Sequence, residues 1–105
     1  MIGGEGSLTR LRPEVVLELE GELDVATAAA AYKRMIERRL PPGGRLVLDL
    51  SAVTFMDSTG IRLILQAREH ALRRDAGLVV VRPPDDVMRV LELVGLDEQL
   101  DLVDP

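Results

Sequence analysis

The sequence predicts a single α/β domain over residues 1–105, with a mixed four- or five-stranded sheet packed with three to four helices. Short runs rich in valine and leucine alternate with longer segments whose apolar residues recur at helical spacing. Glycine and proline clusters separate several of these segments. The chain contains 47% hydrophobic and 30% charged residues, which is typical of a globular domain with one core and not of a disordered chain.

The first part of the chain predicts a strand followed by a helix. Residues 1–7, MIGGEGS, are expected to be a loose amino terminus, and Leu8 to Leu11 are a candidate edge strand. The run EVVLELEG predicts a strand that Gly21 closes. The segment LDVATAAAAYKRMIERRL predicts a helix, with Asp24 as its N-cap. Its apolar residues at helical spacing are Val25, Ala28, Ala29, Tyr32, Met35 and Ile36.

The middle of the chain repeats this order. The sequence PPGG at 41–44 ends the first helix, and RLVLDLS at 45–51 predicts the next strand. Helical periodicity returns from Thr59 to about Asp75. The residues expected near one face of this helix are Ile61, Ile64, Leu65, Arg68 and Leu72, and those on another face are Arg62, Gln66, Glu69 and Arg73.

The last part of the chain predicts a short strand, a helix and a final strand. Gly77 precedes the apolar run LVVV. The segment PPDDVMRVLELVG has prolines at its start, acids in its first turn and Gly95 as its stop, which indicates a helix. LDLV at 100–103 is a candidate edge strand. Strands joined by helices imply right-handed crossovers and a largely parallel or mixed sheet, whose functional loops tend to lie at the carboxyl ends of the strands.

Composition and charge exclude several classes of function. Residues 1–81 carry 11 acids and 11 bases, whereas residues 82–105 carry seven acids and two arginines, so the last segment accounts for the net charge of −5. A nucleic-acid-binding protein needs a basic face with stacking aromatics, and Tyr32 and Phe55 are the only aromatic residues. No apolar run approaches the roughly 18 residues of a membrane span, and the amino terminus does not resemble a signal peptide. We therefore expect a cytoplasmic protein that binds neither nucleic acid nor membrane.

The stretch FMDSTG, residues 55–60, lies between a predicted strand and a predicted helix. In one interpretation, Asp57, Ser58 or Thr59 simply caps the helix. In another, Ser58 is a phosphorylation switch, because a helix amino terminus tolerates a phosphate and the added charge acts on whatever docks there. Gly60 would then allow a partner to approach closely. The residues alone leave both interpretations open.

The same stretch does not predict an enzyme. The nucleophile motif G-x-S-x-G has glycine two residues before the serine, where this chain has Met56. The single histidine, His70, lies twelve positions further along the same helix, about 18 Å from Ser58, so a Ser-His pair within one chain is excluded. We expect His70 to be a surface residue. With one histidine and no cysteine, no metal site is expected.

Three motifs, in order, resemble the STAS domain, and in particular the bacterial anti-sigma factor antagonists. The first is GELD with Thr27 just beyond it, and the second is LVLDLSAVTFMDSTGIRLIL. The third is GLVVV followed by VMRVLELVGLDEQL. The similarity extends from about residue 8 to residue 103, which is nearly the whole chain.

This resemblance implies a function in transcription regulation. The unphosphorylated antagonist binds an anti-sigma factor that is itself a serine kinase, and this releases the sigma factor. The kinase phosphorylates the residue that matches Ser58, rather than Thr59, and thereby switches the antagonist off, and a serine phosphatase resets it. ATP is then expected on the kinase, with no cofactor on this chain.

The resemblance also implies where the partner binds, because the GELD loop lies beside the phosphorylated serine in this family. The expected partner interface consists of Asp24, Thr27, Asp57, Ser58, Thr59, Gly60, Arg62, Gln66 and Glu69. An alternative within the family is an accessory subunit of a lipid-transport ATPase or a component of a stress-sensing assembly. The intact DSTG sequence favours the antagonist.

Overall fold

The computed structural model describes residues 12–105, so the expectations for residues 1–7 and for Leu8 to Leu11 lie outside the described residues. The elements, in chain order, are β1 (Glu14–Leu23), α2 (Val25–Glu37), β2 (Arg45–Met56), α3 (Ser58–Arg73), β3 (Gly77–Val81), α4 (Asp85–Leu93), the 3-10 helix η1 (Leu96–Glu98) and β4 (Leu102–Val103). The α/β class and the expected order of elements from residue 14 onward are confirmed. The second helix was expected to begin at Thr59, and it begins one residue earlier.

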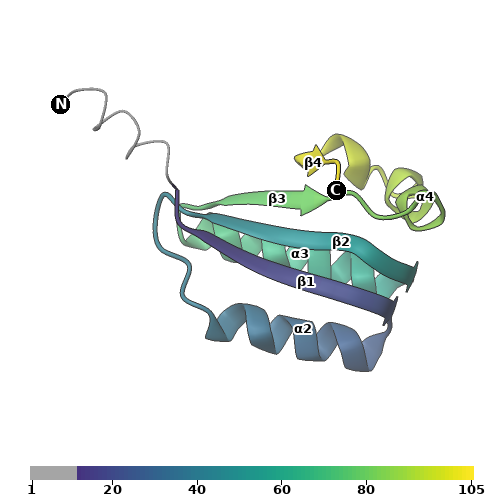
Figure 1. Ribbon diagram of the computed structural model, residues 1–105, viewed down its shortest axis with the longest axis horizontal. Coiled ribbons are helices and arrows are strands. Elements are labelled where there is room, and N and C mark those ends of the chain that lie inside the picture. Colours follow the sequence, from purple (N-terminus) through teal and green to yellow (C-terminus); the bar gives the residue numbers. More distant parts are fainter. Residues whose placement is uncertain (1–11) are drawn as a thin grey trace.

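The four strands form one sheet in the order β1-β2-β3-β4, and every neighbouring pair is parallel. A helix follows each of the first three strands and returns the chain to the same end of the sheet, which produces parallel pairing. Within residues 12–105 the sheet has four strands, where four or five were expected, and it is entirely parallel, whereas a mixed sheet was expected. Helices α2 and α3 lie along one face of this sheet, as Figure 1 shows.

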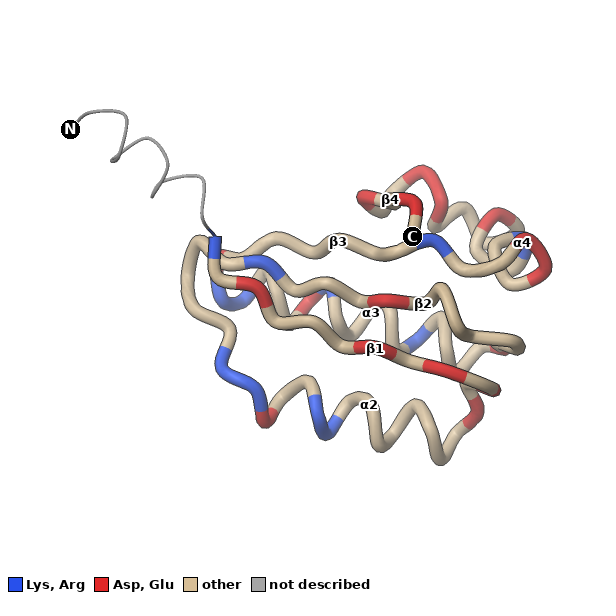
Figure 2. Tube along the Cα trace, in the orientation of Figure 1, with Lys and Arg blue, Asp and Glu red and all other residues tan. Residues whose placement is uncertain are grey.

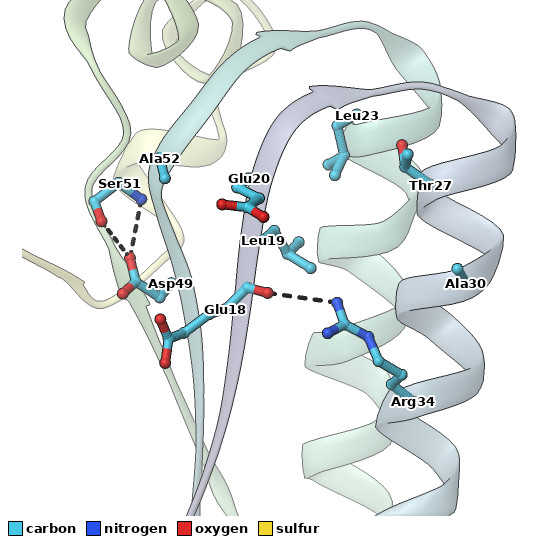
Figure 3. A pocket seen from close by; sticks show the side chains of 10 residues that line it. All are labelled: Glu18, Leu19, Glu20, Leu23, Thr27, Ala30, Arg34, Asp49, Ser51 and Ala52. Carbon is cyan, nitrogen blue, oxygen red and sulfur yellow. Dashed lines mark hydrogen bonds between the residues drawn. The ribbon is translucent and has the colours of Figure 1, made fainter.

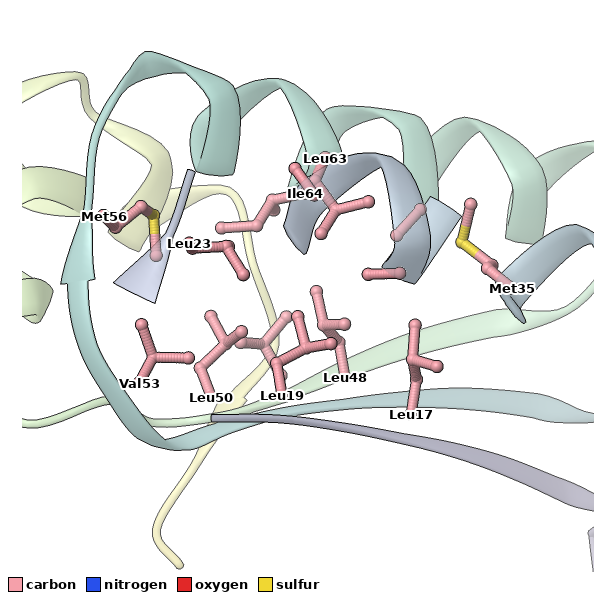
Figure 4. Packing of buried hydrophobic residues seen from close by; sticks show 14 of the residues in the cluster. Leu17, Leu19, Leu23, Met35, Leu48, Leu50, Val53, Met56, Leu63 and Ile64 are labelled. Carbon is pink, nitrogen blue, oxygen red and sulfur yellow. The ribbon is translucent and has the colours of Figure 1, made fainter. Parts of the chain in front are cut away.

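The core fills the space between the sheet and these helices. Residues of β1 alternate between exposed and buried, so that Val15, Leu17 and Leu19 face the helices. Figure 4 shows leucines of β1 and β2 pointing toward Leu63 and Ile64 of α3. Both aromatic residues of the chain are partly exposed, so the core is aliphatic.

Strand β2 continues five residues beyond its predicted end at Ser51. Its pairing with β1 extends to the partners Leu23 and Met56, with register shifts on either side of Gly21. Gly21 has φ +72°, a left-handed conformation that glycine adopts at little cost and that suits an irregularity in a strand. This longer pairing brings the end of β2, where FMDSTG begins, next to the end of β1.

Gly60 lies inside the protein, which corrects its expected place at the partner interface. A Cβ atom at this position would lie 2.2 Å from Cγ of Met56 and 3.0 Å from Cδ2 of Leu23. The first turn of α3 can pack this closely on the ends of β1 and β2 only because position 60 has no side chain. The glycine therefore serves the packing of the fold.

His70 is also buried, with 9% of its surface exposed, which corrects the expectation of a surface residue. The buried face of α3 carries Leu63, Ala67 and His70, whereas Leu72, expected on the main apolar face, is exposed. The Nε2 atom of His70 is buried without a hydrogen-bond partner among residues 12–105. Burial lowers the pKa of His70 below its usual value of 6.5, and the charges of Arg74 and Arg73 lower it further.

We expect the free energy of unfolding to fall as the pH drops below about 6.5. In that range the unfolded chain binds a proton on His70, whereas the folded chain, with its lowered pKa, does not. Urea unfolding at a series of pH values measures this slope for the wild type and for His70→Gln. The variant should lose the part of the slope between pH 6.5 and the folded-state pKa. Identical slopes in both proteins would show that His70 does not carry the effect.

We expect Gly60→Ala to lower the free energy of unfolding by about 1–3 kcal/mol, because Met56 and Leu23 must move to admit the new methyl group. Helix propensity alone would favour alanine by about 1 kcal/mol, so the sign of the effect separates the clash from propensity. Ser58→Ala, in the same helical turn but exposed, is the control and should change stability by less than about 0.5 kcal/mol. A Gly60→Ala variant as stable as the wild type would contradict the packing account.

Candidate functional site

Two helix amino termini lie side by side at the carboxyl ends of β1 and β2. Helix α2 begins directly after Asp24, and helix α3 begins directly after Asp57. The two turns are in contact, because the Oγ1 atom of Thr59 lies 3.3 Å from the backbone carbonyl oxygen of Leu23. The GELD loop and FMDSTG are thus brought together.

The amino terminus of α2 is closed by a reciprocal capping arrangement. The backbone N–H of Thr27 donates to Oδ1 of Asp24 at 3.0 Å, and the backbone N–H of Asp24 donates to Oγ1 of Thr27 at 2.8 Å. The hydroxyl of Thr27 also donates to the carbonyl of Glu22 at 2.8 Å. Both residues remain exposed, so they cap the helix and are also accessible to a partner.

The amino terminus of α3 uses its two hydroxyl residues differently. Oδ1 of Asp57 accepts hydrogen bonds from the backbone N–H of Thr59 at 2.9 Å and from its hydroxyl at 2.6 Å. Thr59 is partly buried and bound in place by these contacts. Ser58 is exposed, and no hydrogen bond within residues 12–105 engages its hydroxyl. The serine hydroxyl is therefore the accessible one.

Both capping aspartates carry a negative charge at neutral pH. The hydroxyl and then the backbone N–H of Thr59 lower the pKa of Asp57. The backbone N–H and hydroxyl of Thr27 lower the pKa of Asp24, while the nearby charge of Asp57 acts in the opposite direction. Asp57 directly precedes Ser58 in the chain, so the serine hydroxyl is presented next to an ionised aspartate.

A groove runs from this turn between α2 and α3. Its first section has a volume of about 410 Å³ and is lined by Val25, Ala28, Ala29, Tyr32, Thr59, Arg62 and Gln66. The second section is lined by Tyr32, Ile36, Gln66, Glu69, His70, Arg73 and Arg74. Tyr32 and Gln66 line both sections, so the two sections adjoin each other. The groove has an apolar side from α2 and a polar side from α3.

Four residues that the sequence placed at the interface line this groove: Thr59, Arg62, Gln66 and Glu69. The apolar side of the groove was not predicted from the sequence. Val25, Tyr32 and Ile36 are 71%, 38% and 46% exposed, although they share the helical repeat with the buried Met35. The sequence could have indicated this exposed apolar surface, because the apolar residues of α2 form a band wider than a single buried helix face requires.

A second hollow, of about 390 Å³, is lined by residues of β1, α2 and β2. Figure 3 shows Arg34 donating a hydrogen bond to the carbonyl of Glu18 at 3.4 Å. Arg38 donates similarly to the carbonyl of Val16 at 3.0 Å. These contacts cover backbone acceptors along β1, which has no further strand beside it in the described sheet. We assign this hollow to the support of the fold.

We also searched residues 12–105 for groups of metal-binding side chains and for helices that could span a membrane. Within residues 12–105 no three histidine or acidic side chains gather in a way that could hold a metal ion. No helix in that part of the chain has both the length and the apolar character needed to cross a bilayer. Figure 2 shows acidic residues at several points of α4 and the segment after it, where acidic residues outnumber basic ones and account for the net charge of the chain.

Comparison with known proteins agrees with this architecture. The STAS domain family model matches residues 7–104. The chain is 36% identical over 83 residues to the anti-sigma-F factor antagonist RsfB of Mycobacterium tuberculosis, covering 79% of this chain and 67% of that protein. It is 29% identical over 82 residues to the anti-sigma-B factor antagonist of Listeria monocytogenes, covering 78% and 72%.

A solved structure gives the same result. The crystal structure of an anti-sigma factor antagonist from Mycobacterium paratuberculosis matches with a TM-score of 0.73 and 30% identity, covering 88% of this chain and 78% of that one. The match therefore extends over most of both chains. This chain belongs to the STAS domain family.

Proposed function

We propose that this protein is an anti-sigma factor antagonist that binds its anti-sigma factor through the surface around Ser58, and that phosphorylation of Ser58 ends the binding. In this proposal the anti-sigma factor is also the serine kinase, and a serine phosphatase restores the free hydroxyl. The observation that carries the proposal is the exposed Ser58 hydroxyl, presented beside an apolar groove in a chain whose relatives are named anti-sigma factor antagonists.

The geometry favours Ser58 over Thr59 as the phosphate acceptor. A kinase must reach the hydroxyl oxygen from solvent, and the hydroxyl of Thr59 donates to Asp57 and contacts the carbonyl of Leu23. Phosphorylation of Thr59 would break these contacts and open the first turn of α3. Phosphorylation of Ser58 requires no such change, since its hydroxyl is engaged by no described residue.

A phosphate on Ser58 is expected to stabilise the folded state but to weaken the binding of a partner. At a helix amino terminus a negative charge meets the positive end of the helix dipole, which favours the folded state by about 0.3–1 kcal/mol. At the interface the same charge is added beside the ionised Asp57 and Asp24. A partner that approaches with its own negative charge, such as the phosphates of bound ATP, then meets like charges in a partly desolvated contact, which costs several kcal/mol.

In this proposal the protein is a binding partner and not an enzyme. The chain needs no cofactor for this function, and the ATP that supplies the phosphate is bound by the kinase. Ser58 has no histidine near it that could act as a base, because His70 is buried further along α3 with its Nε2 atom turned away from solvent. The hydroxyl is thus suited to accept a phosphate from a partner that brings its own catalytic groups.

We expect Ser58→Asp to weaken binding of the anti-sigma factor by about a hundredfold or more, which corresponds to about 3 kcal/mol of opposed charge. Its melting temperature should stay at or above that of the wild type, because the new carboxylate faces the positive end of α3. Isothermal titration against the anti-sigma factor, with thermal melts of each protein, measures both quantities.

Ser58→Ala is the control for this experiment. It removes the phosphate acceptor without adding charge, so it should bind as the wild type does and stay bound when ATP is present. Tight binding by a folded Ser58→Asp protein would contradict the switch. Capture of a membrane ATPase or of a large assembly, with no binding to an anti-sigma kinase, would instead support the alternative roles within the family.

We expect Val25→Ser to weaken binding of the anti-sigma factor by about tenfold. Val25 is largely exposed in the free protein and lines the groove next to Ser58, and full burial of a valine contributes about 1.5 kcal/mol. Leu93→Ser is the matched control, because Leu93 is an exposed apolar residue of α4, at 81%, outside the groove. Equal losses in the two variants would rule out the groove as the specific contact.

A further inference from the structure

Arg62 lies one helical turn after Ser58 on α3. Residues four apart on a helix are neighbours on its surface, and helical side chains lean toward the amino terminus of their helix. The side chain of Arg62 therefore leans toward the turn that carries Ser58 and Thr59. Consistent with this direction, Arg62 and Thr59 line the same section of the groove, across from Val25.

The guanidinium of Arg62 is available for a new partner. Arg62 is exposed, and it takes part in none of the salt bridges or side-chain hydrogen bonds found within residues 12–105. By contrast, Arg73 pairs with Glu69 on the same helix, and Arg68 donates to the side chain of Gln99 at 2.9 Å. Among the residues that line the first section of the groove, Arg62 is the only basic one.

A phosphate on Ser58 would need such a partner. Asp57 already occupies the backbone N–H and the hydroxyl of Thr59, and its carboxylate and that of Asp24 repel an added anion. A guanidinium presents paired N–H donors that match phosphate oxygens, and these charge-assisted bonds are stronger than neutral ones. Arg62 provides this guanidinium four residues after Ser58, a spacing at which two side chains of a helix are neighbours.

We propose that Arg62 is the intramolecular binding partner of a phosphate on Ser58, and that this pairing draws its side chain across the mouth of the groove. The inference rests on the proposed function in taking Ser58 as the phosphate acceptor. In the unphosphorylated protein, the guanidinium is free and the groove beside Val25 is open. In the phosphorylated protein, the pair covers the end of the groove next to Ser58, so phosphorylation changes the shape of the docking surface as well as its charge.

The test uses the whole chain with phosphoserine incorporated at position 58 during translation, so that no kinase is needed. Phosphorus NMR measures the second pKa of the phosphate, which is near 6 for phosphoserine, in the wild type and in Arg62→Gln. A guanidinium in contact with the phosphate favours the dianion and lowers this pKa. We expect Arg62→Gln to raise it by about 0.5 unit, and we expect that difference to shrink in high salt.

Two further variants make the result specific. Arg89→Gln removes the same charge from an exposed position on α4 and should leave the phosphate pKa unchanged. Arg62→Lys keeps the charge and should recover most of the shift. The same phosphate pKa in the wild type and Arg62→Gln, or an equal rise in Arg89→Gln, would overturn the proposal. Neither result depends on whether an anti-sigma kinase binds the protein, so failure here and failure of the proposed function are distinguishable.

Discussion

The first turn of α3 packs against the ends of β1 and β2 so closely that position 60 has no room for a side chain. This contact fixes the direction in which the neighbouring residues point. With Gly60 turned inward and Thr59 in contact with Leu23, Ser58 is left facing solvent. The same contact brings the amino termini of α2 and α3 together, and the groove between the two helices begins there. The accessible serine is thus a consequence of how the helix packs.

The residues that cap α2 and α3 also make this turn negatively charged, because both caps are carboxylates. Asp24 and Asp57 each satisfy amino-terminal donors of a helix, and these hydrogen bonds keep both groups ionised. In the proposed switch, a phosphate on Ser58 is acceptable to the fold, because the helix dipole and Arg62 would offset its charge within the chain. A docked partner that brings negative charge has no such compensation. Stability and binding can therefore respond to one modification in opposite directions.

The sequence predicted those features that depend on local pattern. The sequence pattern located the four described strands and the three α-helices but not η1, and it placed the start of α3 within one residue. Features that depend on tertiary packing were not predictable in this way. Gly60 was interpreted as an opening for a partner, because the position of Met56 relative to it is set by the pairing of β1 with β2. His70 was predicted to be a surface residue because it is polar. The exposed apolar residues of α2 were not distinguished from the buried ones, because both belong to the same helical repeat of apolar residues.

We propose that the partner binds across the adjoining starts of α2 and α3 and along the groove between them. The most direct measurement is an amide NMR titration of the isotopically labelled protein with its anti-sigma factor. The account predicts that the largest shifts occur in residues 24–32 and 57–66, with α4 and η1 little affected. Shifts concentrated in the acidic segment from Asp85 to Asp104, with the signals of Ser58 and Val25 unchanged, would contradict it.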